Sequence, residues 1–270
     1  MQDIERFAEL CLETAPLLDS GLAVIASVLS AHTSEAELLQ GLDDAALEVS
    51  DRFQVASGRS ITQASPAEFC QILFDRQGFR GDRAQYYNSS NSLLDRILVR
   101  RLAIPITLSI LGIEVGRRCG FVFEGIGMPG HFLLAERENP RSFYDPFEGG
   151  RQLSVIQIRE MFETLHGSHH RFDSSFLSPS EPRMILMRVL NNLRVAYERS
   201  GDRERLAQVA RMQSVIPGFA SQSLEFLART LAADGRFLDA AEVHDRLCNE
   251  NPAQAEYHQS AALRLRARLN

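Results

Sequence analysis

Lysine is absent from this sequence of 270 residues, and all 29 basic residues are arginines. The absence excludes mechanisms that need a lysine amine, such as a Schiff base or the phosphate-binding lysine of a P-loop. We attribute the composition to a genome-wide preference for arginine codons and not to a special function of arginine. With 35 acidic residues the net charge is -6, which argues against a general nucleic-acid-binding protein, because such proteins are normally basic.

A local exception to the acidic balance is the stretch of residues 74–87, in which arginines alternate with aromatic side chains. Such a combination stacks on single-stranded nucleic acid in some proteins. Asp75 and Asp82 dilute its charge, so we favour a structured loop that packs its aromatic side chains against the central domain. Just beyond this loop, Asn91 or Ser92 is expected to cap a helix over residues 93–101.

Long apolar runs are also missing. No window approaches the run of about 18 uncharged apolar residues that a membrane-spanning helix needs. Residues 1–10, MQDIERFAEL, lack the basic and then apolar pattern of a signal peptide. We therefore expect a cytoplasmic protein with no membrane segment, and a length that suits one large or two modest domains.

Neither the cysteines nor the histidines are spaced like a metal site. The cysteines are scattered, at Cys11, Cys70, Cys119 and Cys248, with no CxxC spacing, and we interpret them as buried reduced thiols. Three histidines fall within residues 166–170, but no cysteine or carboxylate stands at ligand spacing before Asp173. A polar loop explains these histidines better, so we expect no metal ion and no other cofactor.

The central residues 98–150 carry the features on which a chemical site would depend. Pro105 suits the first position of a helix, and the apolar pattern that follows runs to Cys119 and is too wide for a surface helix. Strand patterns then follow at residues 121–125, 131–135 and 142–147. Two antiparallel strands joined in this way would place His131 beside Asp145, where the carboxylate orients the imidazole as in a nucleophilic triad.

The same region contains several short motifs in a fixed order. They are Gly78-Phe79-Arg80-Gly81-Asp82, Tyr87-Asn88, Asn91-Ser92-Leu93-Leu94, Ile104-Pro105-Ile106-Thr107-Leu108-Ser109, Pro129-Gly130-His131-Phe132 and Asp145-Pro146-Phe147-Glu148-Gly149-Gly150. This set resembles the bacterial SirB family, and the order of helix, histidine strand and aspartate strand is similar to that of the transglutaminase-like, papain-related Cys-His-Asp superfamily. The resemblance covers most of the chain and implies a transglutaminase-like core.

One departure from the resemblance concerns the nucleophile. Active transglutaminase-like enzymes have a cysteine at the start of the helix, where the helix dipole favours the thiolate. This chain has Ile104-Pro105-Ile106 there, and Ala103 stands where the SirB pattern usually has glycine. Cys119 is about 14 residues further on, or roughly 20 Å along a helix, and is too far away to replace the missing thiol.

The remaining polar groups near the helix start allow two interpretations. Thr107 and Ser109 carry the only hydroxyls there, and each is a weak nucleophile that would depend on His131 as a base. Alternatively the site binds without reacting, because free N–H groups beyond the proline suit a carboxylate or a carbonyl of a bound peptide. The expected binding residues are then Pro105, Ile106, Thr107, His131 and Asp145. His131 and Asp145 also suit a purely structural pair.

The C-terminal region contains an internal repeat. Gly201 and Gly235 are 34 residues apart, as are Ala207 and Ala241, and 34 is the tetratricopeptide period. Such a repeat predicts an antiparallel helical array over residues 183–270, which we expect to pack on the central domain and to be unstable alone. A plain helical bundle is the alternative.

The sequence thus predicts an α+β fold that is mostly helical, with a small antiparallel transglutaminase-like sheet. The expected parts are a helical N-terminal region at 1–64, the core at 65–177 and the helical repeats at 183–270. The favoured function is a non-catalytic regulatory or scaffold protein that binds a protein or peptide. The alternative is a hydrolase or acyltransferase that uses His131 and Asp145 with an unconventional nucleophile. The sequence leaves the partner and the oligomeric state open.

Overall fold

The computed structural model describes residues 2–13, 17–30 and 33–269, which form two compact units. One unit comprises residues 17–189, and the other comprises residues 190–270 together with the N-terminal segment 1–16. This division by compactness does not test the boundaries predicted from the sequence, which stay predictions. It does assign the first helix to the same unit as the C-terminal helices.

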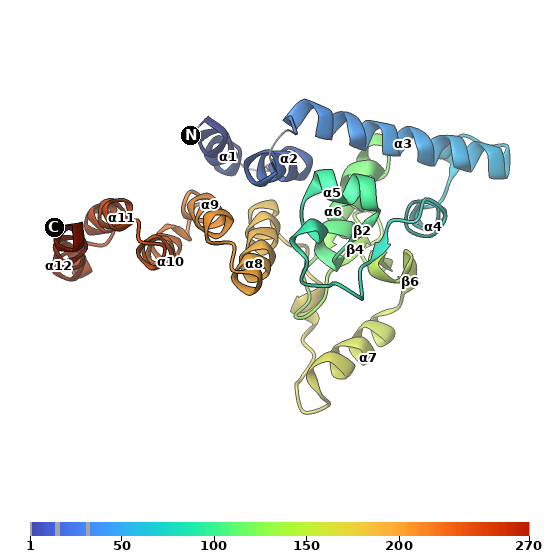
Figure 1. The fold of residues 1–270 in the computed structure, drawn as a ribbon. Helices are drawn as coiled ribbons and strands as arrows, with labels where there is room; N and C mark the ends of the chain where they lie inside the picture. The colour runs from blue at the N-terminus through green and yellow to red at the C-terminus, as the bar shows by residue number, and fades with distance from the viewer. Residues whose placement is uncertain (1, 14–16, 31–32, 270) are drawn as a thin grey trace. The chain divides into compact units, whose positions relative to one another are not determined.

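The larger unit is built mainly of helices (Figure 1). They are α2 (Leu18–Leu29), α3 (Glu35–Ser57), α4 (Pro66–Gln71) with a π-helical continuation over Ile72–Arg76, α5 (Leu94–Arg100), α6 (Pro105–Arg118), α7 (Val155–His166) and the first part of α8 (Pro182–Ser200). The start of α4 follows from its sequence, because Ser65 and Glu68 form a capping box around Pro66. Ser154 and Gln157 cap α7 in the same way.

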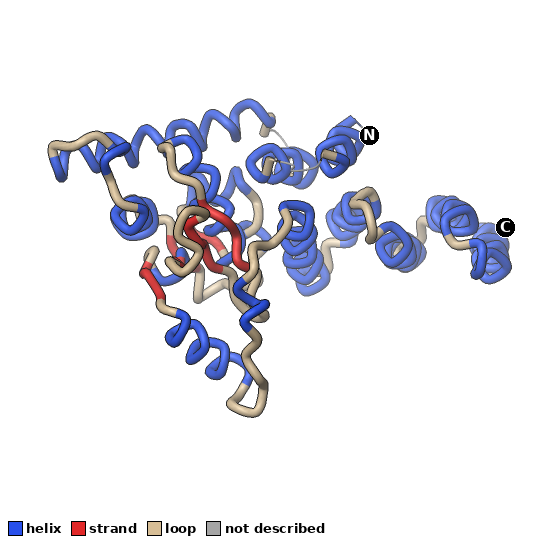
Figure 2. The backbone as a smooth tube through the Cα atoms, turned by 180° about the vertical axis from the view of Figure 1, so that it is seen from behind, coloured by secondary structure: helices blue, strands red, loops and turns tan. Residues whose placement is uncertain are grey.

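A small antiparallel sheet lies within this unit, and its strands are red in Figure 2. Its strands are β3 (Phe123–Ile126), β4 (Leu133–Glu136), β5 (Phe143–Asp145) and β6 (Arg151–Leu153), in that spatial order. A separate parallel pair joins β1 (Arg80–Gly81) to β2 (Leu102–Ala103). The helix-rich α+β fold with an antiparallel sheet is therefore confirmed, whereas β6 and the β1–β2 pair were not predicted.

Helix α6 forms the centre of the core, because most of its side chains are buried. It packs on β3 and β4 as well as on α3. Gly112 makes the approach to the sheet possible, since a Cβ atom at this position would lie only 2.6 Å from Cδ1 of Leu134. The apolar width of the pattern after Pro105 thus predicted a buried helix correctly, and the missing side chain at Gly112 brings that helix directly onto β4.

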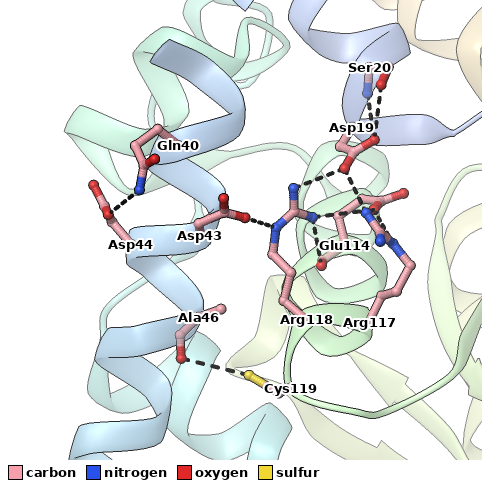
Figure 3. A network of polar contacts seen from close by, with 10 residues as sticks. All are labelled: Asp19, Ser20, Gln40, Asp43, Asp44, Ala46, Glu114, Arg117, Arg118 and Cys119. Atoms are coloured by element: carbon pink, nitrogen blue, oxygen red, sulfur yellow. Dashed lines mark hydrogen bonds and ion pairs between the residues drawn. The ribbon is translucent and has the colours of Figure 1, made fainter. Parts of the chain in front are cut away.

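Charged side chains fasten the C-terminal end of α6 to α2 and α3 (Figure 3). Asp19 of α2 lies 2.8 Å from Nη2 of Arg117 and 3.0 Å from Nη2 of Arg118. Nε of Arg118 also donates to Asp43 of α3 at 2.5 Å. Burial, and then the nearby charge of Asp19, raise the pKa of Glu114, while the two arginines act in the opposite direction. This network fixes the end of α6 farthest from the expected site.

The second unit contains only helices among its described residues. They are α1 (Gln2–Leu12), the second part of α8, α9 (Arg203–Ser214), α10 (Ala220–Ala233), α11 (Phe237–Glu250) and α12 (Ala255–Arg266). Consecutive helices from α9 to α12 pack on each other, and α1 packs on α9 (Figure 1).

The packing of these helices follows from small and branched apolar side chains. Their shared core includes Ala207, Ala210, Leu224, Leu227, Ala228, Leu231, Ala240, Val243 and Leu247. Gly201 and Gly235 each turn the chain between two helices with φ of 73° and 76°, a conformation that favours glycine. Equivalent turns at the 34-residue spacing fit the repeat pattern, and the tetratricopeptide assignment itself stays a prediction.

Candidate functional site

The turn that carries His131 connects β3 to β4 and is held from two helices. The backbone N–H of His131 donates to the carbonyl of Met128 at 3.2 Å. Nε2 of His166, at the end of α7, lies 3.0 Å from the carbonyl of Pro129. From α8, Nη2 of Arg188 donates to the carbonyls of Met128 and His131 at 3.3 and 3.4 Å. Hydrogen bonds to the carbonyls of Met128, Pro129 and His131 therefore fix the backbone of the turn.

His131 and Asp145 form a hydrogen-bonded pair, as the sequence predicted. Nε2 of the imidazole lies 3.1 Å from each carboxylate oxygen of Asp145. The histidine side chain is 12% exposed and the aspartate side chain 1%. Asp145 ends β5, whose register with β4 brings it close, but His131 itself lies two residues before β4 and not within a strand.

The second contact of Asp145 fixes the direction of its carboxylate. Oδ1 also accepts the backbone N–H of Phe147 at 3.0 Å. A neutral imidazole that donates its Nε2 proton to this carboxylate leaves Nδ1 as an acceptor. Nδ1 makes no hydrogen bond to any residue that the structure describes, so it is the nitrogen left for a ligand.

Aromatic side chains surround one side of the imidazole. The ring of Phe147 meets His131 edge-on with 6.2 Å between ring centroids, and Tyr86 meets Phe147 edge-on at 6.2 Å. The guanidinium of Arg83 lies 5.4 Å from the centroid of Phe147, and Arg83 forms an ion pair with Glu148. We call the group formed by His131, Asp145, Phe147, Tyr86 and Arg188 the His131 site.

The hydroxyls at the start of α6 are buried and bonded to backbone carbonyls. Oγ1 of Thr107, which is 1% exposed, donates to the carbonyl of Asn91 at 2.6 Å. Oγ of Ser109, fully buried, lies 3.5 Å from the carbonyl of Phe132. Pro105 and Ile106 are buried as well. The structure therefore directs both candidate nucleophiles away from a hydrogen bond with His131.

The loop from Asp82 to Asn91 is ordered by side-chain bonds, as expected of a structured loop. Arg100 donates to Asp82 and to Asn91, each at 3.0 Å, and Nδ2 of Asn91 donates to the carbonyl of Gln85 at 2.7 Å. The expected cap at Asn91 or Ser92 is wrong, because α5 begins after Leu93 without any side-chain cap. Asn91 instead holds the loop that supplies Tyr86 to the His131 site.

The thiols of the larger unit are poorly placed for nucleophilic chemistry. Burial, and then the charge of Glu136, raise the pKa of the fully buried Cys70 thiol well above its usual value. Burial also raises the pKa of Cys119, with a hydrogen bond from Ser50 acting in the opposite direction. Of the other two cysteines, Cys11 is buried and Cys248 is partly exposed.

The histidine-rich loop after α7 does not form a metal site with other residues of the described chain. The described histidines, cysteines and carboxylates form no group of three or more that is arranged to hold a metal ion. The rings of His166 and His170 pack edge-on, and the ring centroids of His169 and His170 lie 5.2 Å apart. No helix of the described chain is both long and apolar enough to cross a membrane.

Arg188 is the site residue that sequence reasoning missed. It falls within the apolar run Ile185-Leu186-Met187-Arg188-Val189-Leu190, which reads as a buried helix face. A charge inside such a run was the available signal, because burying a cation is costly unless it has a local role. Only the tertiary structure shows that its guanidinium reaches the turn of His131.

Comparison with known proteins identifies the family. A model of the transglutaminase-like superfamily matches residues 36–191, which include every member of the His131 site. The chain belongs to the transglutaminase-like superfamily. Within the chain, the match begins in α3 and ends in α8. No solved structure matches the chain significantly.

Curated relatives of this superfamily member extend the comparison. A UPF0162 protein of Xylella fastidiosa (strain 9a5c) is 35% identical over 152 residues, or 54% of this chain and 54% of the relative. A UPF0162 protein of Pseudomonas aeruginosa is 31% identical over 212 residues, or 76% of this chain and 74% of the relative. Human F-box only protein 21 is 30% identical over 139 residues, or 48% of this chain and 21% of that protein. The chain thus spans about half the length of the Xylella relative it matches.

Proposed function

We propose that this protein is a non-catalytic regulatory or scaffold member of the transglutaminase-like superfamily, of SirB type, which binds a protein or peptide partner. Binding would use the His131 site and the C-terminal helices, which we take as tetratricopeptide-like repeats. The protein would act in the cytoplasm, without a membrane, a nucleic acid or a cofactor as its partner.

A single contrast carries this proposal. The imidazole of His131 and the carboxylate of Asp145 are in hydrogen-bonding geometry, whereas no serine, threonine or cysteine in the described part of the chain forms a hydrogen bond with His131. Nucleophilic catalysis needs the attacking atom within hydrogen-bond reach of the base. An oriented imidazole without a hydrogen-bonded nucleophile still offers a nitrogen for binding, so the histidine–aspartate pair supports the proposal of recognition over catalysis.

The competing proposal, a hydrolase or acyltransferase, needs Thr107 or Ser109 to act as the nucleophile. Each hydroxyl would first have to leave a backbone carbonyl and become accessible to a substrate. A hydroxyl is also much less acidic than a thiol and depends more on its base. These costs favour the binding proposal.

The test compares partner capture by three forms of the full chain: wild type, His131→Ala and His169→Ala. His169 lies exposed in a loop, so its replacement controls for the loss of an imidazole as such. We expect His131→Ala to weaken the capture of a partner found with wild type, and His169→Ala to leave it unchanged. Equal capture by all three forms would contradict the proposed role of the His131 site.

A further inference from the structure

Arg188 is a partly buried cation of the larger unit and forms no ion pair with a carboxylate of the described residues. Its guanidinium lies 5.0 Å from the centroid of Phe132, and Nη2 donates to two backbone carbonyls of the turn. Within the described residues no carboxylate forms an ion pair with it, and Nε and Nη1 make no hydrogen bond.

Other half-buried arginines of the same unit show the usual arrangement. Arg100 pairs with Asp82 at 3.0 Å, Arg101 with Glu48 at 2.8 Å, and Arg118 with Asp19 at 3.0 Å. A partly buried cation that lacks such a partner keeps an unbalanced charge at a desolvation cost. Burial lowers the pKa of Arg188, and only Tyr86 acts in the opposite direction.

The guanidinium of Arg188 contacts the backbone of the residue that supplies the imidazole of the His131 site. The guanidinium is 3.4 Å from the carbonyl oxygen of His131, and the imidazole of that residue has Nδ1 free. The two groups have complementary requirements, because the guanidinium donates hydrogen bonds and Nδ1 of the neutral imidazole accepts one.

We propose that the His131 site binds the end of a peptide, with the terminal carboxylate on Arg188 and the last backbone N–H donating to Nδ1 of His131. Tyr86 and Phe147 would pack against the terminal side chain, and Tyr86 is 37% exposed. This inference rests on the proposed binding function and specifies its ligand. Arginine suits the role because its planar fork matches a carboxylate.

Acidic groups near the site are already occupied, so they do not satisfy Arg188. Asp145 accepts from His131 and from the backbone of Phe147. Glu148 pairs with Arg83. In the proposal, the carboxylate of the ligand supplies the negative charge that Arg188 lacks among the described residues.

The experiment titrates the full chain with three small probes and follows the imidazole signals of His131 by NMR. The probes are N-acetyl-Ala-Ala with a free carboxylate, the same peptide as its C-terminal amide, and N-acetyl-glutamate amide, which carries only a side-chain carboxylate. We expect saturable shifts with the free acid and none with the amide. The glutamate probe separates a terminal from a side-chain carboxylate, and stronger binding of that probe than of the acid would overturn the terminal assignment.

Variants then test whether the guanidinium is the receptor. Arg188→Met should weaken binding of the free acid by about tenfold or more, since a charge-assisted hydrogen bond is lost, and Arg188→Lys should retain part of it. Arg159→Met is the matched control, because Arg159 also lies over an aromatic ring, 5.7 Å from the centroid of Phe172. Unchanged affinity in Arg188→Met would show that Arg188 only holds the turn and would overturn the proposal.

If Arg188→Met fails to fold, the comparison of the acid with the amide in the wild-type protein still tests whether the His131 site binds a carboxylate. Equal responses to the two probes contradict the carboxylate site but leave partner capture through His131 standing. Conversely, the free acid could bind while His131→Ala captures the partner as well as wild type does. This result would contradict the proposed function but support the carboxylate site.

Discussion

Oγ1 of Thr107 donates a 2.6 Å hydrogen bond to the backbone carbonyl of Asn91, which ties the start of α6 to the loop before α5. The bond uses the hydroxyl that lies nearest to the expected nucleophile position. In the folded protein this hydroxyl therefore serves as a structural hydrogen-bond donor.

Replacing Thr107 by Val removes this donor and leaves the carbonyl of Asn91 with only the long 3.5 Å hydrogen bond from the backbone N–H of Ile104. We expect a loss of about 1 to 3 kcal/mol in the free energy of unfolding, measured by urea denaturation. Ser109→Ala should cost less, because its 3.5 Å contact is at the limit of a hydrogen bond. A Thr107→Val protein of unchanged stability that had lost a hydrolytic activity of the wild type would instead support the enzyme hypothesis.

Asp145 satisfies two donors, Nε2 of His131 and the N–H of Phe147. Asp145→Ala should therefore lower the free energy of unfolding by about 1 to 3 kcal/mol, because buried donors lose their acceptor. Asp173→Ala is the control, since Asp173 accepts a backbone N–H in an exposed turn, and its loss should be smaller. Equal effects of the two replacements would indicate that the His131 pair adds nothing to stability.

Cys70 and Cys119 should resist alkylation in the folded protein. Both thiols are buried and their pKa values are raised, so the reactive thiolate is scarce. Iodoacetamide at neutral pH followed by peptide mass spectrometry should leave both unlabelled until urea is added. Specific labelling of either cysteine that disappears in His131→Ala would reveal a relocated nucleophile and reverse our view of the site.

Asp82 should contribute a pH-dependent part of the stability. Burial raises the pKa of its carboxyl, but hydrogen bonds from the Gln85 backbone and from Arg100 and Asn91 outweigh burial and lower the pKa. The unfolded chain then binds more protons in acid, so this contribution is complete above the unfolded pKa of about 4 and is lost as the pH falls through the folded pKa.

Asp82→Asn should accordingly reduce the fall in stability between neutral pH and acid, as measured by urea unfolding at a series of pH values. Its stability at neutral pH should be lower than that of wild type, because the ion pair with Arg100 is lost. An identical pH profile in the two proteins would show that the carboxylate does not titrate differently on folding.

Phe7 of α1 should stabilise the C-terminal helices, since it is fully buried and α1 packs on α9. Phe7→Ala should cost about 3 to 5 kcal/mol through the cavity that it leaves. Leu12→Ala is the control, because Leu12 is 73% exposed. Hydrogen exchange should rise in α9 of the Phe7 variant, and an unaffected α9 would contradict the role of this contact.

Local patterns were sufficient to predict much of the fold. Pro105 and the wide apolar pattern located α6, and the capping residues around Pro66 located α4, because helix starts and buried faces depend on neighbouring residues. The short strands were placed within a few residues, and the pairing of His131 with Asp145 followed from the order of two adjacent strands.

The sequence by itself thus determined the helices, the antiparallel order around the sheet and the histidine–aspartate pair. Only the tertiary structure decided that Arg188 meets the turn of His131 and that α1 packs on α9. The physical reason is that an apolar face shows that a segment is buried but does not specify its partner. Which surfaces meet depends on the shapes and charges of all elements together, and these contacts join residues far apart in the chain.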